Sequence, residues 1–205
     1  MKRLFAAIKI HPDYEFLKRY QELKQALRHE QIKWVEEQNI HITLHFFGET
    51  EDRDMVLIQS VLGRVAEKEE PFRIGLSGLG IFGSSYSPRV IWARIEPVHY
   101  LLGFMIELKS ALENAGFEND RQNIVPHLSL GRIKELKEKQ FFQRMIGQFK
   151  DTVSIEEQIG EIFLFESRLY KTGPLYIIQK SFEFGKKNTP ADDTPDSGVL
   201  QREGF

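Results

Sequence analysis

Two short segments, one in each half of the 205-residue chain, have the same order of residue types. Residues 41–44 read His-Ile-Thr-Leu and residues 127–130 read His-Leu-Ser-Leu, and a glycine follows each segment, Gly48 and Gly131. Polar and apolar residues alternate in both, which is the two-residue period of a strand with one face in the core. One such segment would mean little. Two in equivalent settings restrict the chain to folds in which two half-sites face each other.

The other apolar residues indicate how these two strands are embedded. Helical spacing is seen in residues 14–29, 49–68, 98–115 and 135–148. Strands are expected at residues 4–10, 39–48, 71–82, 89–95, 124–132, 155–166 and 175–184, with 32–35 as an extended link. After the first strand the order helix, motif strand, helix, strand, strand occurs twice, and the loops within the strand pairs are too short for parallel crossovers. We predict an α/β (α+β) fold: bilobal, with two pseudo-symmetric antiparallel sheets, about one from each half of the chain, flanked by helices around a central cleft.

Composition sets the domain organisation and excludes several classes of protein. Residues 1–185 are expected to form one bilobal domain, and residues 186–205, which are mostly small and polar, a disordered tail. The absence of cysteine excludes disulfides, thiolate zinc sites and cysteine nucleophiles. A net charge of −2 argues against a broad footprint on duplex nucleic acid but permits a local phosphate site. No apolar run approaches the ~20 residues of a membrane span, so we expect a cytoplasmic monomer without membrane association.

The alternating pattern places specific chemistry on the polar faces of the motif strands. His41 and Thr43 point the same way, as do His127 and Ser129, because residues two apart share a face. If the strands face each other, two imidazoles and two hydroxyls converge. One histidine can take a proton while the other gives one near neutral pH, and the hydroxyls can donate hydrogen bonds to phosphoryl oxygens. The pattern therefore favours acid–base cleavage of a phosphodiester without a metal.

A metal site is the weaker interpretation of the same histidines. His41 and His45 have the four-residue spacing that binds zinc on a helix, but on a strand they would stand roughly 13 Å apart. No carboxylate cluster accompanies them, so we expect no metal and place His45 at the rim of the cleft or in solvent. Arg132 is five residues beyond His127, and strict alternation turns it to the opposite face. A bulge at Gly131 could return it to a bound phosphate, and both orientations remain open.

These motifs resemble those of the 2H phosphoesterase superfamily, and more closely the bacterial and archaeal RNA 2′,3′-cyclic phosphodiesterases once called 2′-5′ RNA ligases. The family has two His-x-Thr/Ser-x motifs, and Ser129 keeps the hydroxyl where threonine is commoner. The resemblance covers about residues 3 to 184. Its further matches are residues 3–5, 33–35, 47–49, 167–169 and 173–176, together with Pro126 and Arg132.

The resemblance implies hydrolysis of an RNA-terminal 2′,3′-cyclic phosphate to a 2′-phosphomonoester, without cofactor. By position, His41 would be the proton donor and His127 the proton acceptor, with Thr43, Ser129 and Arg132 binding the substrate. An aromatic side chain is expected to stack on the base. The candidates are Phe5, Phe47, Tyr86 and Tyr176.

Two other functions are compatible with the residues. The first is a 2H phosphodiesterase that acts on a small cyclic nucleotide instead of an RNA terminus. The second is a non-catalytic module that binds RNA ends or nucleotides, although a binder does not need an acid–base pair.

Overall fold

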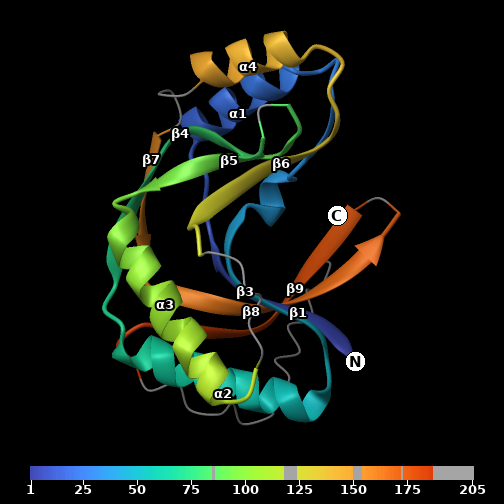
Figure 1. Cartoon of the computed structure of the whole chain (residues 1–205). Coiled ribbons are helices and arrows are strands. Elements are labelled where there is room, and N and C mark those ends of the chain that lie inside the picture. The colour runs from blue at the N-terminus through green and yellow to red at the C-terminus, as the bar shows by residue number, and fades with distance from the viewer. Residues whose placement is uncertain (85, 118–123, 150–153, 172, 187–205) are drawn as a thin grey trace, which may run out of the picture.

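The computed structural model describes residues 1–84, 86–117, 124–149, 154–171 and 173–186, and its elements follow the predicted order closely (Figure 1). The helices are α1 (Tyr14–Ala26), η1 (Glu37–Asn39), α2 (Asp52–Lys68), α3 (Val98–Asn114) and α4 (Lys139–Gln148). The strands are β1 (Lys2–Lys9), β2 (Gln31–Trp34), β3 (His41–Thr50), β4 (Phe72–Gly83), β5 (Pro88–Glu96), β6 (His127–Glu135), β7 (Ser154–Ile159), β8 (Glu161–Tyr170) and β9 (Gly173–Glu183).

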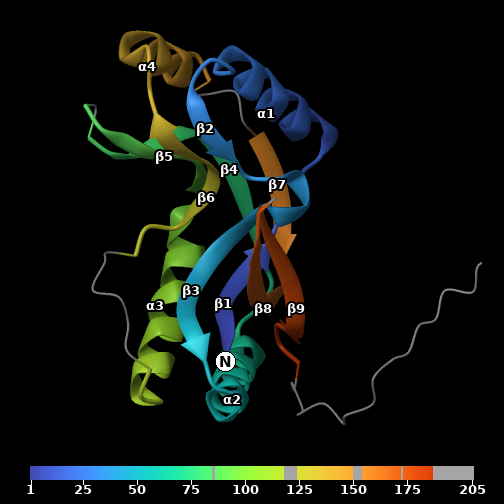
Figure 2. The same ribbon diagram turned by 90° about the vertical axis from the view of Figure 1, so that its right-hand side faces the viewer.

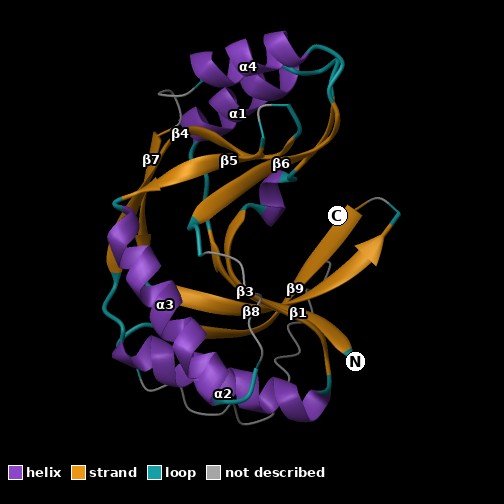
Figure 3. Cartoon of the chain, in the orientation of Figure 1, coloured by secondary structure: helices purple, strands orange, loops and turns teal. Residues whose placement is uncertain are grey.

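The strands form two antiparallel sheets, and the predicted fold class is confirmed. The four-stranded sheet has the order β3-β1-β8-β9 and the five-stranded sheet the order β2-β6-β5-β4-β7. Helices α1 and α4 lie outside the five-stranded sheet, while α2 and α3 lie outside the four-stranded sheet (Figure 3). The motif strands β3 and β6 belong to different sheets and contact each other.

The expectation that each half of the chain builds one sheet is wrong. The β4–β5 hairpin follows the first motif strand, yet it pairs with β6, the second motif strand. Strand β3 instead pairs with β1, and β1 pairs with β8 from the second half. The view in Figure 2 shows β1, β3, β8 and β9 side by side. The predicted strand 155–166 is accordingly two strands, because the chain passes from one sheet to the other at Gly160.

The edge segment 31–34 is also a strand, where the sequence analysis expected only an extended link. It is β2, and it pairs with β6. Pro126 directly precedes β6, as expected for a residue that cannot donate to a sheet ladder. The sequence predicts a polar tail at residues 186–205. All of it after residue 186 lies outside the described residues.

Alternation along β1 shows how the four-stranded sheet separates its two faces. Leu4, Ala6 and Ile8 belong to the main hydrophobic core, which also contains residues of all four helices. Phe5 and Ala7 point the other way and form a small separate cluster with Phe163 and Phe165, against which Tyr176 packs. Both faces of β1 are buried, and the second face leads directly to the first motif.

Candidate active site

The two motif histidines occupy the same position in their strands and make the same hydrogen bond. His41 begins β3 and His127 begins β6. The Nδ1 atom of His41 donates to the carbonyl of Asn39 at 2.6 Å, and Nδ1 of His127 donates to the carbonyl of Val125 at 2.7 Å. Because a carbonyl can only accept, the proton of each neutral ring is on Nδ1. Each Nε2 is therefore the atom left to take up or release a proton.

The hydroxyl of the first motif lies beside one of these nitrogens. Thr43 Oγ1 is 3.1 Å from Nε2 of His41, as expected for residues two apart on one face of a strand. Ser129 has the equivalent position in β6, two residues after His127, and is half-buried. The predicted sharing of faces within each motif is thus seen in the structure.

The histidines and Arg132 are close enough to act on one another electrostatically. Burial lowers the pKa of His41, and the charges of His127 and Arg132 lower it further, against the opposing effect of the Asn39 carbonyl. Burial also lowers the pKa of His127, the Val125 carbonyl opposes it, and Arg132 lowers it further. Arg132 acts on the Tyr176 hydroxyl as well. The surroundings of both imidazoles therefore favour the neutral form in the free protein.

A bulge in β6 explains the position of Arg132. Ser129 is opposite Trp92 and Gly131 is opposite Ile91, the next residue on β5, so Leu130 has no partner of its own. This extra residue shifts the alternation and returns Arg132 to the face of His127 and Ser129. Gly131 is needed there, since a Cβ atom would lie 2.9 Å from side-chain atoms of Ile32 and Trp34. Of the two orientations left open by the sequence, the structure has the one that faces the histidines.

A similar bulge in β3 overturns the position expected for His45 and sets the position of Phe46. Ala7 is opposite Thr43 and Ala6 is opposite His45, so Leu44 is unpaired. After this bulge His45 faces the core side of the sheet, where it is half-buried near α3, and not the rim of a cleft. Phe46, which unbroken alternation placed in the core, turns instead to the face of His41.

The half-buried His45 makes folding sensitive to acid. Burial and the charge of Lys109 lower its pKa from 6.5 to about 4, against the opposing effect of Glu113. The unfolded chain therefore takes up this proton at a higher pH than the folded chain, so stability falls as the pH drops from 6.5 towards 4. Between pH 7 and pH 5 the unfolding free energy of wild type should fall by about 2 kcal/mol more than that of the His45→Gln variant. Urea unfolding at both pH values measures this.

His99→Gln is the control for that measurement, because His99 is exposed at the start of α3. It should keep the full acid sensitivity of the wild type. The same pH dependence in His45→Gln and wild type would contradict the assignment.

Aromatic rings surround both histidines. The rings of Phe5 and Tyr176 each have their centroid 5.2 Å from that of His41. The rings of Phe82 and Trp92 lie 4.7 Å and 6.2 Å from His127. These rings help to bury the two imidazoles, and burial is the largest cause of the lowered pKa of each.

Two of the aromatic residues proposed to stack on a base are engaged within the protein. Phe5 is only 2% exposed, and Phe47 packs against Phe117 at 6.0 Å. Phe46 is 64% exposed and lies beside Phe5 with ring centroids 5.8 Å apart. Sequence analysis missed Phe46, because only the bulge at Leu44 turns it out of the core. Tyr176 contacts His41 directly, and Tyr86 lies in the exposed β4–β5 loop.

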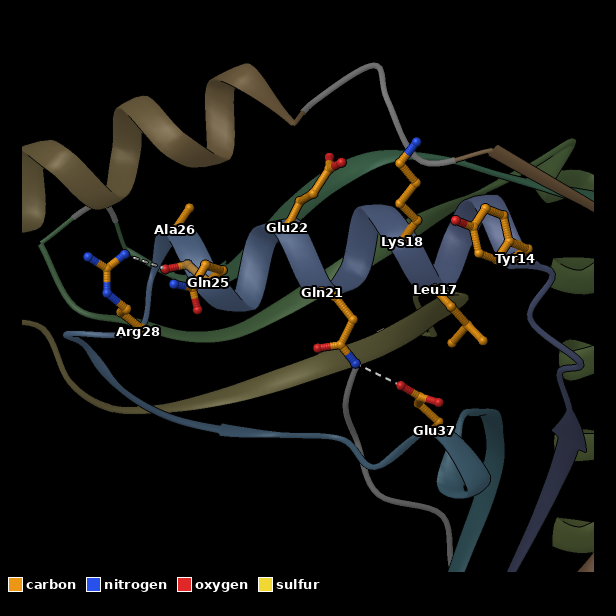
Figure 4. A pocket seen from close by; sticks show the side chains of 9 residues that line it. All are labelled: Tyr14, Leu17, Lys18, Gln21, Glu22, Gln25, Ala26, Arg28 and Glu37. Carbon is orange, nitrogen blue, oxygen red and sulfur yellow. Dashed lines mark hydrogen bonds between the residues drawn. The ribbon is translucent and has the colours of Figure 1, made fainter.

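Three further observations concern metal binding, membrane spans and other hollows in the described part of the chain. Among the described residues, no group of three or more His, Cys, Asp or Glu side chains could hold a metal ion. No helix in the described part of the chain is both long and apolar enough to cross a membrane. A hollow along α1 contains no residue of either motif, and Gln21 and Glu37 are hydrogen-bonded across it (Figure 4).

Comparison with known proteins identifies the family. The profile described as LigT like Phosphoesterase matches residues 10–92, which include the first motif. The RNA 2′,3′-cyclic phosphodiesterase of Methanocaldococcus jannaschii is 32% identical over 88% of this chain and 99% of its own. That of Aquifex aeolicus is 30% identical over 75% of this chain and 82% of its own.

Solved structures share the fold. The protein TT0787 of Thermus thermophilus has a TM-score of 0.70 at 24% identity, covering 89% of this chain and 98% of that one. LigT of E. coli, solved with 3′-AMP, has a TM-score of 0.68 at 19% identity, covering 90% and 99%. Given its relatives at 30% identity or more along most of their length, the chain belongs to the LigT-like 2H phosphoesterase family.

Proposed function

We propose that this protein hydrolyses the 2′,3′-cyclic phosphate at an RNA end to a 2′-phosphomonoester, with His41 and His127 as an acid–base pair and without a metal. The observation that carries the proposal is the matched pair of Nδ1–carbonyl hydrogen bonds, which leaves two Nε2 atoms available beside one arginine. The names of the M. jannaschii and A. aeolicus relatives support the reaction class. A binding module does not need an acid–base pair.

In the proposed reaction, His127 accepts a proton from water as the water oxygen bonds to phosphorus. The bond from phosphorus to the 3′ oxygen breaks, and His41 donates its proton to that oxygen. One proton is taken and one is given, so the pair returns to its starting charge after exchange with solvent. Thr43, Ser129 and Arg132 are assigned to the non-bridging phosphoryl oxygens, where charge gathers in the transition state.

The lowered histidine pKa values fit this cycle only with the substrate bound. His127 must be neutral to accept a proton, which its environment favours. His41 must be protonated to donate one, and its environment opposes this. A bound phosphate anion would offset the charge of Arg132 and raise the pKa of His41. Binding of the substrate phosphate thus favours the protonated form of His41 that the reaction requires.

The distribution of positive charge fits a substrate with few phosphates. Lys33 is opposite Arg132 on β2, and Arg94 is opposite His127 on β5, so both lie on the face of the second motif. The chain nevertheless has a net charge of −2. A local group of cations suits an RNA end or a cyclic nucleotide better than a long duplex.

Turnover of a short RNA with a terminal 2′,3′-cyclic phosphate, measured in EDTA with the product position resolved, tests the proposal. We expect a 2′-phosphate. A 3′-phosphate would mean that the substrate binds in the reverse orientation between His41 and His127. Binding without turnover would contradict the enzymatic function, and turnover of cyclic mononucleotides alone would identify a small-molecule substrate.

Phe46 is the residue we expect to stack on the base of the bound nucleotide. Stacking of a base on an aromatic ring contributes about 1–3 kcal/mol, so Phe46→Ala should raise KM for a nucleoside 2′,3′-cyclic phosphate by about tenfold with little change in kcat. Ribose 2′,3′-cyclic phosphate, which lacks a base, should show no such change. Comparing the two substrates measures the effect.

Tyr14→Ala is the matched control, since Tyr14 is an aromatic residue on α1 with 74% of its surface exposed. It should leave both KM values unchanged. An equal rise in KM for the two substrates in Phe46→Ala would exclude a stacking role.

A further inference from the structure

The hydroxyl of Tyr20 lies at the junction of the two motifs. Tyr20 is on α1, is only 2% exposed, and packs against Phe16 and Trp34. Its Oη atom is 2.7 Å from the carbonyl oxygen of Val35 and 2.8 Å from that of Leu130. A phenol has one proton, so the two carbonyls share a single donor.

Each of these carbonyls belongs to a segment that places catalytic groups. Leu130 is the unpaired residue of the β6 bulge, between Ser129 and Arg132. Its carbonyl also accepts the backbone N–H of Val35 at 2.9 Å. Val35 follows β2 and leads through η1 to Asn39, whose carbonyl fixes the tautomer of His41. The hydroxyl therefore touches the bulge of the second motif and the segment that enters the first.

The two carbonyls require a hydroxyl donor at position 20. A bulge interrupts the ladder and leaves backbone groups to be satisfied by other donors. The Val35 carbonyl has no partner besides Tyr20 among the backbone bonds of the described residues. Burial raises the pKa of Tyr20, so its proton stays in place as a donor. Phenylalanine would fill the same space and donate nothing.

We infer that Tyr20 is a positioning residue, whose buried hydroxyl joins the entry of the first motif to the bulge of the second and thereby holds His41 and Arg132 in register. The activity readouts of this inference rest on the proposed function. Tyr20 is too deeply buried to touch a substrate, and its effect on catalysis passes through the backbone. A misplacement of about 1 Å in a catalytic group can lower a rate about a hundredfold, so the loss of one hydrogen bond can matter here.

The test is the Tyr20→Phe variant alone and combined with Arg132→Ala. Alone it should lower kcat about tenfold and leave KM within about twofold. In the Arg132→Ala background the same change should cost clearly less than tenfold, because one of the two groups that Tyr20 helps to position is gone. Losses that multiply fully in the double variant, or an unchanged kcat in the single variant, would overturn the inference.

Leu23→Val separates positioning from plain loss of stability. Leu23 is 1% exposed on the same helix, and its side chain has no polar atom that could bind either carbonyl. Leu23→Val should lower the unfolding temperature. At assay temperatures well below the unfolding temperature, its kcat should equal that of wild type. A matching loss of kcat in Leu23→Val would show that any disturbance of α1 has the effect attributed to the Tyr20 hydroxyl, and would overturn the inference.

Hydrogen exchange of the Val35 amide tests the contact without any substrate. This amide donates to Leu130, so loosening the junction in Tyr20→Phe should speed its exchange at least about tenfold relative to wild type. Unchanged exchange would overturn the inference whatever the kinetics. Faster exchange in a protein that turns over no cyclic phosphate would support the junction and count only against the proposed function.

Discussion

Replacing either His41 or His127 with alanine is expected to lower kcat on a 2′,3′-cyclic phosphate by about a thousandfold or more, with both variants folded. General acid and general base catalysis each contribute about 10²–10⁴-fold, and the other imidazole of β3 is not placed to take over. His45 follows the bulge in β3, so its side chain is on the core face of the sheet and not on the face of His41. The measurement is steady-state turnover together with circular dichroism and the unfolding temperature.

The residual activity of the two variants should depend on pH in opposite directions. A base must be unprotonated and an acid protonated, so the wild type should give a bell-shaped profile. Without the base His127, only the decline of rate with rising pH remains. Without the acid His41, only the rise remains. This contrast assigns the roles, which the sequence indicates only through its resemblance to a family. His99→Ala should keep the wild-type profile, and full activity in either motif variant would refute the mechanism.

Replacing Arg132 with alanine should lower kcat about a hundredfold, because a preorganised donor at a charged transition state contributes about 10²–10³-fold. It should also move the pH profile. The charge of Arg132 lowers the pKa of both histidines, so its removal raises both and shifts the whole profile to higher pH. The pH–rate profile of kcat/KM, measured over the full range of stability, reports these values for the free enzyme.

Arg132→Lys distinguishes charge from geometry. Lysine keeps the positive charge and should leave the profile near its wild-type position, but it lacks the planar fork that binds two phosphoryl oxygens, so kcat should stay low. Arg144→Ala, on the outer helix α4, should change neither quantity. A profile that stays in place in Arg132→Ala would contradict the placement of this side chain next to the histidines.

The sequence was sufficient where local periodicity decides the structure. The shared faces of His41 with Thr43 and of His127 with Ser129 follow from the two-residue period of a strand. The helices follow from spacing as well. Alternation alone fails at Leu44, because one unpaired residue sends His45 to the core side and Phe46 to the motif face. In β6 the small residue Gly131 indicated that a bulge was possible, and β3 has no glycine beside Leu44.

Strand partners could not be predicted in the same way. The hydrophobic pattern shows which face of a strand is buried but contains no information about which other strand lies next to it. Neighbours along the chain are a reasonable default, and for β4 and β5 they are correct. The default fails for the four-stranded sheet, because β1 lies between β3 and β8, and β8 is distant from both in the sequence.

The interleaving of the two sheets has a consequence for synthesis on the ribosome. The four-stranded sheet that holds the first motif requires β8 and β9, so it cannot be complete until residue 183 has left the exit tunnel. The five-stranded sheet likewise waits for β7. No nascent chain that ends before these strands can bring the two histidines together in their final setting. A nascent chain therefore holds both motif sequences before it can hold the folded setting of either motif.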